Sequence, residues 1–427
     1  MIRSFIYAWL IYWVAVALLP VHSIYPAVVQ AFFLQLGFVA LVVFGYFVAS
    51  PRSREILMPY AINGEIRATR GLVTLAFYMS LAGFVFLLFD KVYVQGIDYS
   101  NGLAIAREQW KELGEEREGK ASSIWSVLGY VFGSAYYVAM VLVITQTRQF
   151  SRRRRLVSIV VCFVFALANS IITGGRSNFM LLGAVALCAF SARRGLRVRD
   201  VLTSRKQRRY VTAICVLTAG YIVFVFYGRA AAGNQLVYMY VVSFLPYMGL
   251  DFDEWYRQSV TSGWLGAIGN MSILVIGYLT HSFATVAAII DAPQEDKTII
   301  FNNFISIFYK LGLMDRPDDE WFLKGRFPSV PGALWHQFGP AAYLISSFLL
   351  GVAAALASLW ARLRPHRLLP LGVQILTATT LILTPYVFAP DFLAFPSVLV
   401  AFVMLSPLAR LGRARRRQVV QPVPDTQ

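Results

Sequence analysis

Long runs of apolar residues, separated by short polar segments, recur along most of the chain. A helix needs about 20 apolar residues to cross the hydrocarbon core of a bilayer, and ten of the runs approach that length. We therefore expect an all-α, polytopic helical membrane protein with about 10–12 transmembrane helices. The ten expected spans cover residues 5–19, 27–49, 71–89, 124–144, 156–172, 179–190, 210–227, 340–360, 368–388 and 392–408.

The pattern changes between residues 229 and 338, where Pro246, several glycines and polar residues interrupt the apolar stretches. Irregular helices persist at membrane depth only where protein or a wet cavity surrounds them. We expect a large, partly embedded or re-entrant outer region that crosses the membrane either not at all or twice. The chain then divides into helices over 1–228, this outer region over 229–338, C-terminal helices over 339–409 and a basic tail over 410–427.

One polar stretch has the periodicity of a helix without the length of a span. Between residues 103 and 118, the apolar residues recur at the spacing of one helix face. They are Leu103, Ile105, Ala106, Trp110 and Leu113. The pattern predicts an interfacial helix that lies on the outer membrane surface.

Basic residues concentrate in every second polar segment, and this indicates the orientation. Those segments hold 26 of the 39 Lys and Arg residues but only 4 of the 22 Asp and Glu residues. They cover residues 3, 52–70, 148–155, 193–209, 362–367 and 410–427. By the positive-inside rule they face the cytoplasm, as do both termini, and the other segments face the periplasm.

Composition excludes several classes of protein. With 58% hydrophobic residues, the chain of 427 residues is not a water-soluble globule. Its net charge of +17 lies in the inner segments, where topology and anionic lipids explain it, so membrane lipids and not nucleic acid are the expected partners. Cys162, Cys188 and Cys215 lie within expected spans without metal-binding spacing, and we expect them to be packing residues.

The turn between the fifth and sixth spans carries the first candidate binding group. Gly174 and Gly175 permit a tight backbone and the close approach of a ligand. The helix start after them offers N–H groups to an anion, and Arg176 adds a guanidinium. A second Gly-Arg pair places Arg229 at the outer end of the seventh span, so two arginines are expected to clamp a diphosphate. The alternative for Arg176 is a side chain that reaches lipid phosphates.

A later stretch, residues 324–339, reads KGRFPSVPGALWHQFG and leads into the eighth span. With the glycine-arginine turn, the later outer arginine and the long outer region, it resembles the oligosaccharide repeat unit polymerases, the Wzy-type O-antigen polymerases of bacterial surface polysaccharide assembly. The matched residues are Gly174, Gly175, Arg176, Phe327, Pro328, Trp335, Phe338 and Gly339. Many relatives carry an acidic residue near Ala333 or Gln337, and this chain does not, so no base is carried over from there.

The resemblance implies a GT-C-like fold and a reaction at the periplasmic face of the bacterial inner membrane. A glycan on undecaprenyl diphosphate would be transferred en bloc to the terminal sugar of another lipid-linked repeat unit. The site must stabilise the negative charge that develops on the leaving diphosphate. Arg176, Arg229 and Arg326 are the expected clamp, with no metal or other cofactor. A chain-length regulator in the same membrane is an implied partner.

The acceptor hydroxyl also needs a base or an orienting group. His281 and His336 are the two outer-facing histidines in apolar surroundings, and Asp253 and Glu254 are acids near the second arginine. A structural role is the alternative for each histidine.

Aromatic residues in the outer region are candidates for stacking on sugar rings. Tyr256 and Trp335 are the two that we select, although aromatic residues are also common at membrane interfaces.

Two other functional classes stay open. An O-antigen ligase would use the same donor but give the glycan to the lipid A core. A transporter or flippase of lipid-linked sugars would favour charged or broken helices near the bilayer midplane and an internal repeat. The unusual charges of this chain lie instead at the outer face.

Overall fold

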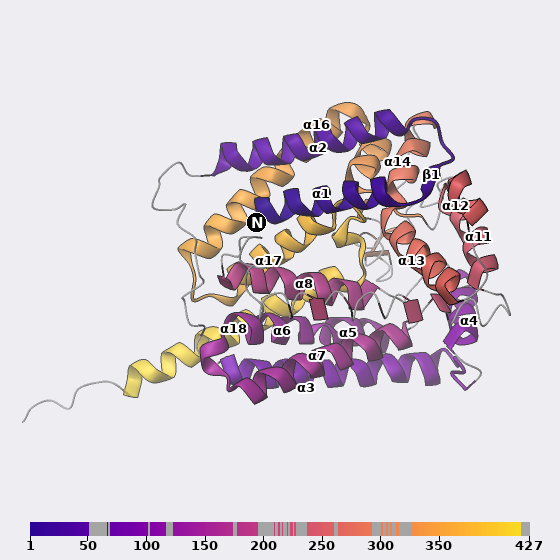
Figure 1. The fold of residues 1–427 in the computed structure, drawn as a ribbon. Coiled ribbons are helices and arrows are strands. Elements are labelled where there is room, and N and C mark those ends of the chain that lie inside the picture. Colours follow the sequence, from indigo (N-terminus) through magenta and orange to yellow (C-terminus); the bar gives the residue numbers. More distant parts are fainter. Residues whose placement is uncertain are drawn as a thin grey trace, which may run out of the picture.

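The computed structural model shows a mostly helical chain whose long helices lie side by side in a bundle (Figure 1). It describes residues 1–50, 66, 69–100, 103–116, 123–173, 177–194, 237–259, 264–292 and 326–419, with scattered residues between 209 and 227 and between 300 and 315. Most of the expected span 210–227, with Cys215, lies outside the described residues.

The first half of the chain forms α1 and α2 in the upper part of Figure 1, and it also supplies helices to the lower part. Its elements are α1 (Ile2–Leu18), β1 (Val21–Ser23), α2 (Val28–Ala49), α3 (Thr69–Phe89), the π-helical turn η1 (Asp90–Val94), α4 (Leu103–Glu116), α5 (Ile124–Gly133), α6 (Ala135–Thr145), the short 3-10 turn η2 (Thr147–Gln149), α7 (Arg152–Ile172) and α8 (Ser177–Arg194). A helix was predicted over 103–118 and another after Gly174 and Gly175, and the described residues Leu103–Glu116 and Ser177–Arg194 are helical.

The second half adds the irregular region and the last helices. Its elements are α11 (Val237–Tyr247), β2 (Leu250–Phe252), α12 (Glu254–Ser259), α13 (Trp264–Thr280), α14 (Ser282–Asp291), α16 (Val330–Leu363), α17 (Leu368–Leu383), the 3-10 turn η3 (Ala389–Asp391) and α18 (Ala394–Val419). Short or broken elements were expected between residues 229 and 338, and the described part of that region has them.

Several described helices are suited to crossing a membrane. Five stretches are long and apolar enough by length and composition: α2, α3 with η1, α5 with α6, α7 and α16. A sixth would be α13 with α14, which are bent by 49° at His281. Phe33, Phe47 and Val164 are more than half exposed on such helices, as expected of side chains that face lipid. These features are compatible with a multi-pass membrane protein. The apolar parts of α1, α8, α17 and α18 are shorter, at 10–17 residues, so ten spans stay a prediction.

Two helices in the upper part of Figure 1, α2 and α16, pack with their backbones in close contact. A Cβ atom at Gly45 would lie 2.2 Å from the carbonyl oxygen of Phe348, and one at Gly351 would lie 2.1 Å from that of Val42. Small residues permit such close approach between membrane helices. The larger core lies among α3, α6, α7, α8, α17 and α18, and includes the buried thiols of Cys162 and Cys188. The packing role of these two cysteines is confirmed.

The helical segment before residue 340 was not predicted. The eighth span was expected from residue 340, and a helix does begin there, after a break at Gly339 with a φ of 73°, but α16 also includes a helical segment from Val330 to that break. Pro331 is tolerated in the first turn of a helix because no intrahelical bond is needed there. The Val330 N–H instead donates to the carbonyl oxygen of Thr384, 3.1 Å away, which joins the helix start to the end of α17.

The connection between α1 and α2 pairs with a segment far along the chain. β1 and β2 form a two-stranded antiparallel sheet in which His22 faces Asp251. The sheet lies with α11, α12 and α4 at one end of the bundle, the right end in Figure 1. The C-terminal end of α18 lies at the opposite end. Elements that were expected on the outer side therefore gather at one end.

Candidate functional site

The described residues on either side of Gly174, Gly175 and Arg176 accept hydrogen bonds from tyrosine hydroxyls of other elements. Tyr99 follows η1, and its hydroxyl donates to the carbonyl oxygen of Ile172 at 2.9 Å. The Tyr137 hydroxyl of α6 donates to the carbonyl oxygen of Asn178 at 2.8 Å. Ile172 ends α7 and Asn178 is the second residue of α8, so the two backbone segments that enter and leave the turn are fixed to the bundle.

The residues of the turn itself, Gly174, Gly175 and Arg176, lie outside the described residues, and so does Arg229. Their role as a diphosphate clamp stays a prediction.

Two buried residues with ionisable side chains near Tyr99 were not singled out from the sequence. Asp90 is fully buried and Lys91 is 2% exposed, both in η1 at the end of α3. The two oxygens of Asp90 accept from the Ser123 hydroxyl at 2.5 Å and from Gln95 Nε2 at 2.6 Å. Lys91 Nζ donates to Gln95 Oε1 at 3.2 Å. Polar groups in such a place need hydrogen-bond partners, and both side chains have them.

The same pair connects the interfacial helix to the bundle. Lys91 Nζ lies 4.5 Å above the ring of Trp110 in α4, within the range of a cation–π contact. Burial, and then the negative charge of Asp90, raises the pKa of Tyr99 to about 12, so its hydroxyl stays protonated and able to donate. A network of η1, α4 and Tyr99 thus supports the segment before the turn.

Arg326 is the one residue of the proposed clamp that lies within the described part of the chain. Its Nη1 donates to the Tyr25 hydroxyl at 2.9 Å, and its guanidinium lies 5.5 Å from the ring centre of Tyr247. Gly249 lies beside it with a φ of 77°, and a Cβ there would come within 2.7 Å of the Tyr25 ring. A glycine is therefore required at this place, and the side chain of Arg326 is held by two aromatic residues.

His281, at the bend between α13 and α14, uses both ring nitrogens in structural contacts. Nδ1 lies 2.5 Å from the carbonyl oxygen of Tyr278, and Nε2 lies 3.1 Å from the backbone nitrogen of Phe327. These two hydrogen bonds require a neutral ring with the proton on Nδ1, because Nε2 must accept from the Phe327 N–H. His281 thereby fixes the backbone beside Arg326. Its role as a base stays a prediction.

The other candidates on α16 are partly or wholly buried. His336 is 2% exposed, and Trp335 packs edge-on against Tyr343 with ring centres 5.8 Å apart. Gln337 Oε1 accepts from the backbone N–H of Ile300 at 2.7 Å, which ties the helix to the segment before it.

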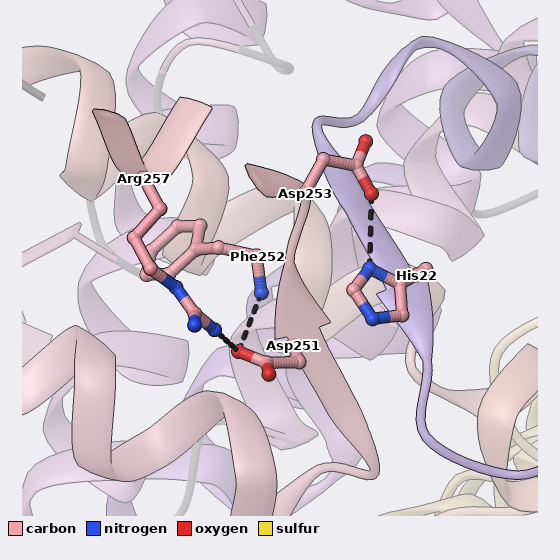
Figure 2. A network of polar contacts seen from close by, with 5 residues as sticks. All are labelled: His22, Asp251, Phe252, Asp253 and Arg257. Carbon is pink, nitrogen blue, oxygen red and sulfur yellow. Dashed lines mark hydrogen bonds and ion pairs between the residues drawn. The ribbon is translucent and has the colours of Figure 1, made fainter. Parts of the chain in front are cut away.

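Asp253, which was singled out near β2, belongs with Asp251 to a separate network at the surface (Figure 2). Asp253 Oδ1 lies 3.0 Å from His22 Nδ1, and Asp251 Oδ1 lies 2.6 Å from Arg257 Nη2. Burial raises the pKa of Asp251, but the hydrogen bonds from Arg257 and the Phe252 backbone outweigh it, so that pKa is lowered overall.

These contacts join the loop after α1 to the start of α12, where Glu254 lies. Tyr256 stacks on Phe252 and donates to Asn270 Oδ1 at 3.2 Å.

Asp391 is a further acid that the sequence pattern did not reveal. It ends η3 between α17 and α18, and burial raises its pKa to about 8, opposed by a hydrogen bond from the Phe301 backbone. A group with a pKa near neutrality suits proton transfer. Its burial could not be read from the sequence, because its hydrogen-bond donor, the Phe301 backbone, is far away along the chain.

The described residues contain no group of three or more His, Cys, Asp and Glu side chains placed to hold a metal ion. Comparison of the chain with protein-family models, curated proteins and solved structures finds no significant match to any of them.

Proposed function

We propose that this protein is a membrane polysaccharide polymerase that transfers a glycan en bloc from undecaprenyl diphosphate to another lipid-linked repeat unit. The acceptor hydroxyl attacks the anomeric carbon, the bond from that carbon to the diphosphate oxygen breaks, and the hydroxyl proton passes to a base. The diphosphate leaves with the bonding electrons. Arginine side chains in a site with little water stabilise its charge.

The fixed position of Arg326 is the observation that carries the proposal. The guanidinium stands at the start of the segment that resembles the polymerase family, and Tyr25, Tyr247 and the His281 contact to Phe327 hold it. An arginine that is oriented before the substrate binds loses less conformational freedom on binding a diphosphate. The segment also lies beside the broken helix pair α13 and α14, the kind of element that lines a cavity at membrane depth.

The base belongs to a small set of residues. The candidates are Asp253 in the surface network, Glu254 at the start of α12, His281 at the bend between α13 and α14, and His336, which is buried on α16.

The length of the surface polysaccharide tests the proposal. A deletion strain is complemented with the wild type, Arg176→Ala, Arg229→Ala, Arg326→Ala or the matched control Arg257→Ala, and the glycans are separated by gel. Arg257 is an exposed outer arginine that pairs with Asp251, so its loss should leave the ladder intact. The three clamp variants should reduce the ladder to a single repeat unit at normal protein levels.

Two results would contradict this function. Full-length polymer in all three clamp variants would exclude the arginine clamp. A normal ladder on lipid-linked intermediates that is missing from the lipid A core would indicate a ligase.

A further inference from the structure

We propose that a small cavity among α5, α6, α7 and α8 binds one structural water molecule through the side chain of Asn169. The polar residues that line the cavity are Tyr130, Ser134, Tyr136, Asn169, Thr173 and Asn178. Leu87, Gly129, Gly133 and Ala394 complete its wall. The inference does not depend on the proposed function, because it rests on the packing of the helices alone.

The size of the cavity fits one water molecule. About 10 Å³ is open to the centre of a water-sized sphere, close to the least that a single water needs. A sugar, a phosphate or a lipid chain is far larger than this space. The ligand must also be one that forms hydrogen bonds, since more than half of the named lining residues are polar.

Asn169 supplies the reason for a bound water. Its side chain lies one helical turn before Thr173, and only 4% of the residue is exposed. Among the residues that the structure describes, neither Oδ1 nor Nδ2 has a partner in hydrogen-bond geometry. The Tyr136 hydroxyl is close enough to interact with the amide as a weak hydrogen-bond partner, but it does not meet the geometry of a full hydrogen bond. A buried amide without well-placed partners is destabilising, and a water that bonds both of its ends removes that cost.

Further acceptors for the same water are present in the wall. The Ser134 hydroxyl donates to the carbonyl oxygen of Tyr130 at 3.1 Å, and the Thr173 hydroxyl donates to that of Asn169 at 2.7 Å. Each hydroxyl oxygen keeps lone pairs that can accept from water. A buried water usually makes two to four hydrogen bonds, and Asn169 with one hydroxyl meets that need.

The place of the cavity gives the water a structural role. Thr173 and Asn178 are residues on either side of the glycine-arginine turn, and Gly133 and Ser134 stand at the junction of α5 and α6. A water on Asn169 would therefore connect the ends of α7 and α8 to the break between α5 and α6.

Gly133 allows a direct test, because an added methyl group enters the cavity without a clash. A Cβ there would lie 3.8 Å from Leu87 Cδ1 and 3.9 Å from Asn169 Oδ1, both ordinary contacts. In an unhydrated cavity, Gly133→Ala should stabilise the protein, since alanine favours the helix and fills space. In a hydrated cavity it displaces the water and leaves Asn169 without partners.

The experiment is a double-mutant cycle on the full chain in lipid nanodiscs, with Tm as the readout. Gly133→Ala should lower Tm by about 2 °C or more in the wild-type background. In the Asn169→Leu background, where no amide needs the water, it should leave Tm unchanged or raise it. An equal shift of either sign in both backgrounds would overturn the proposal.

A second measurement covers the case in which Asn169→Leu does not fold. In a map of the wild-type protein that resolves other ordered waters, density should stand within hydrogen-bond distance of Asn169. A map of that quality with no such density overturns the proposal. A third result would assign the cavity to a cation instead. The Tm of the wild type would then rise with sodium chloride but not with choline chloride, and the Tm of Gly133→Ala would rise with neither salt.

Discussion

At the scale of single residues, the hydroxyls of Tyr99 and Tyr137 hold the backbone of Ile172 and Asn178, and we expect them to position Arg176 between these two residues. Tyr99→Phe and Tyr137→Phe each remove one donor and leave the ring in place. We expect each to reduce polymer output about tenfold, because a small displacement of a charged group from the reacting atoms is costly. Polymer length on gels and the rate of polymer formation measure the effect.

The matched control for these variants is Tyr93→Phe. Tyr93 is in η1, 77% exposed, and stacks on Phe89, so its ring contact survives the change. Tyr99→Phe combined with Arg176→Ala should be no worse than Arg176→Ala alone, since the tyrosine acts through the turn. A further loss in the double variant would show that Tyr99 acts elsewhere.

The sequence revealed the residues of the site better than their partners. Arg326, His281 and Asp253 were found as polar groups in apolar or outer surroundings. Tyr25, which lies 301 positions from Arg326, and Tyr99, which lies 73 positions from Ile172, were not found, because such pairs form only when the chain is folded. In the sequence, Asp90 looks like the first residue of a polar loop. In the fold it is buried, with hydrogen bonds from Ser123 and Gln95 to its carboxylate.

At the scale of elements, the contact between α2 and α16 depends on glycine. Gly351→Ala puts a methyl group 2.1 Å from the Val42 carbonyl oxygen, and no side-chain rotation can relieve a contact with backbone. We expect a loss of about 1–3 kcal/mol in the free energy of unfolding, since the helices must separate. Thermal unfolding in nanodiscs measures the change.

Gly71→Ala in α3 is the control for this substitution. A Cβ at Gly71 meets nothing within 4 Å, so it should be neutral or slightly stabilising. Equal stability of Gly351→Ala and Gly71→Ala would contradict the close backbone packing of α2 on α16.

Helices were predictable from apolar runs because a backbone inside a bilayer must satisfy its own hydrogen bonds. The residues at which these helices begin or break were harder to predict. In the sequence, the first turns of α16 look like a polar loop with two prolines. They are helical in the structure, where the Val330 N–H bonds to the carbonyl oxygen of Thr384, a residue far along the chain. The sheet of β1 and β2 pairs residues more than 200 positions apart, so no local pattern could indicate it.

At the scale of the whole molecule, the helices form the bundle, and the elements expected on the outer side gather at one end of it. Arg326, His281 and the network of Asp251 and Asp253 come from three segments that the sheet and the bent helix pair bring to the outer region. The proposed polymerisation would need such a place, where a lipid-linked donor can enter from the membrane and the acceptor sugar can approach from outside.

The most direct test is polymerisation by the purified full chain in liposomes. The substrate is the undecaprenyl-diphosphate-linked repeat unit extracted from the deletion strain, and the readouts are glycan length and free undecaprenyl diphosphate. We predict a ladder with one diphosphate released for each new linkage, unchanged by EDTA and lost in Arg176→Ala. Repeat units that stay single with the folded wild-type protein, while no diphosphate is released, would contradict the account.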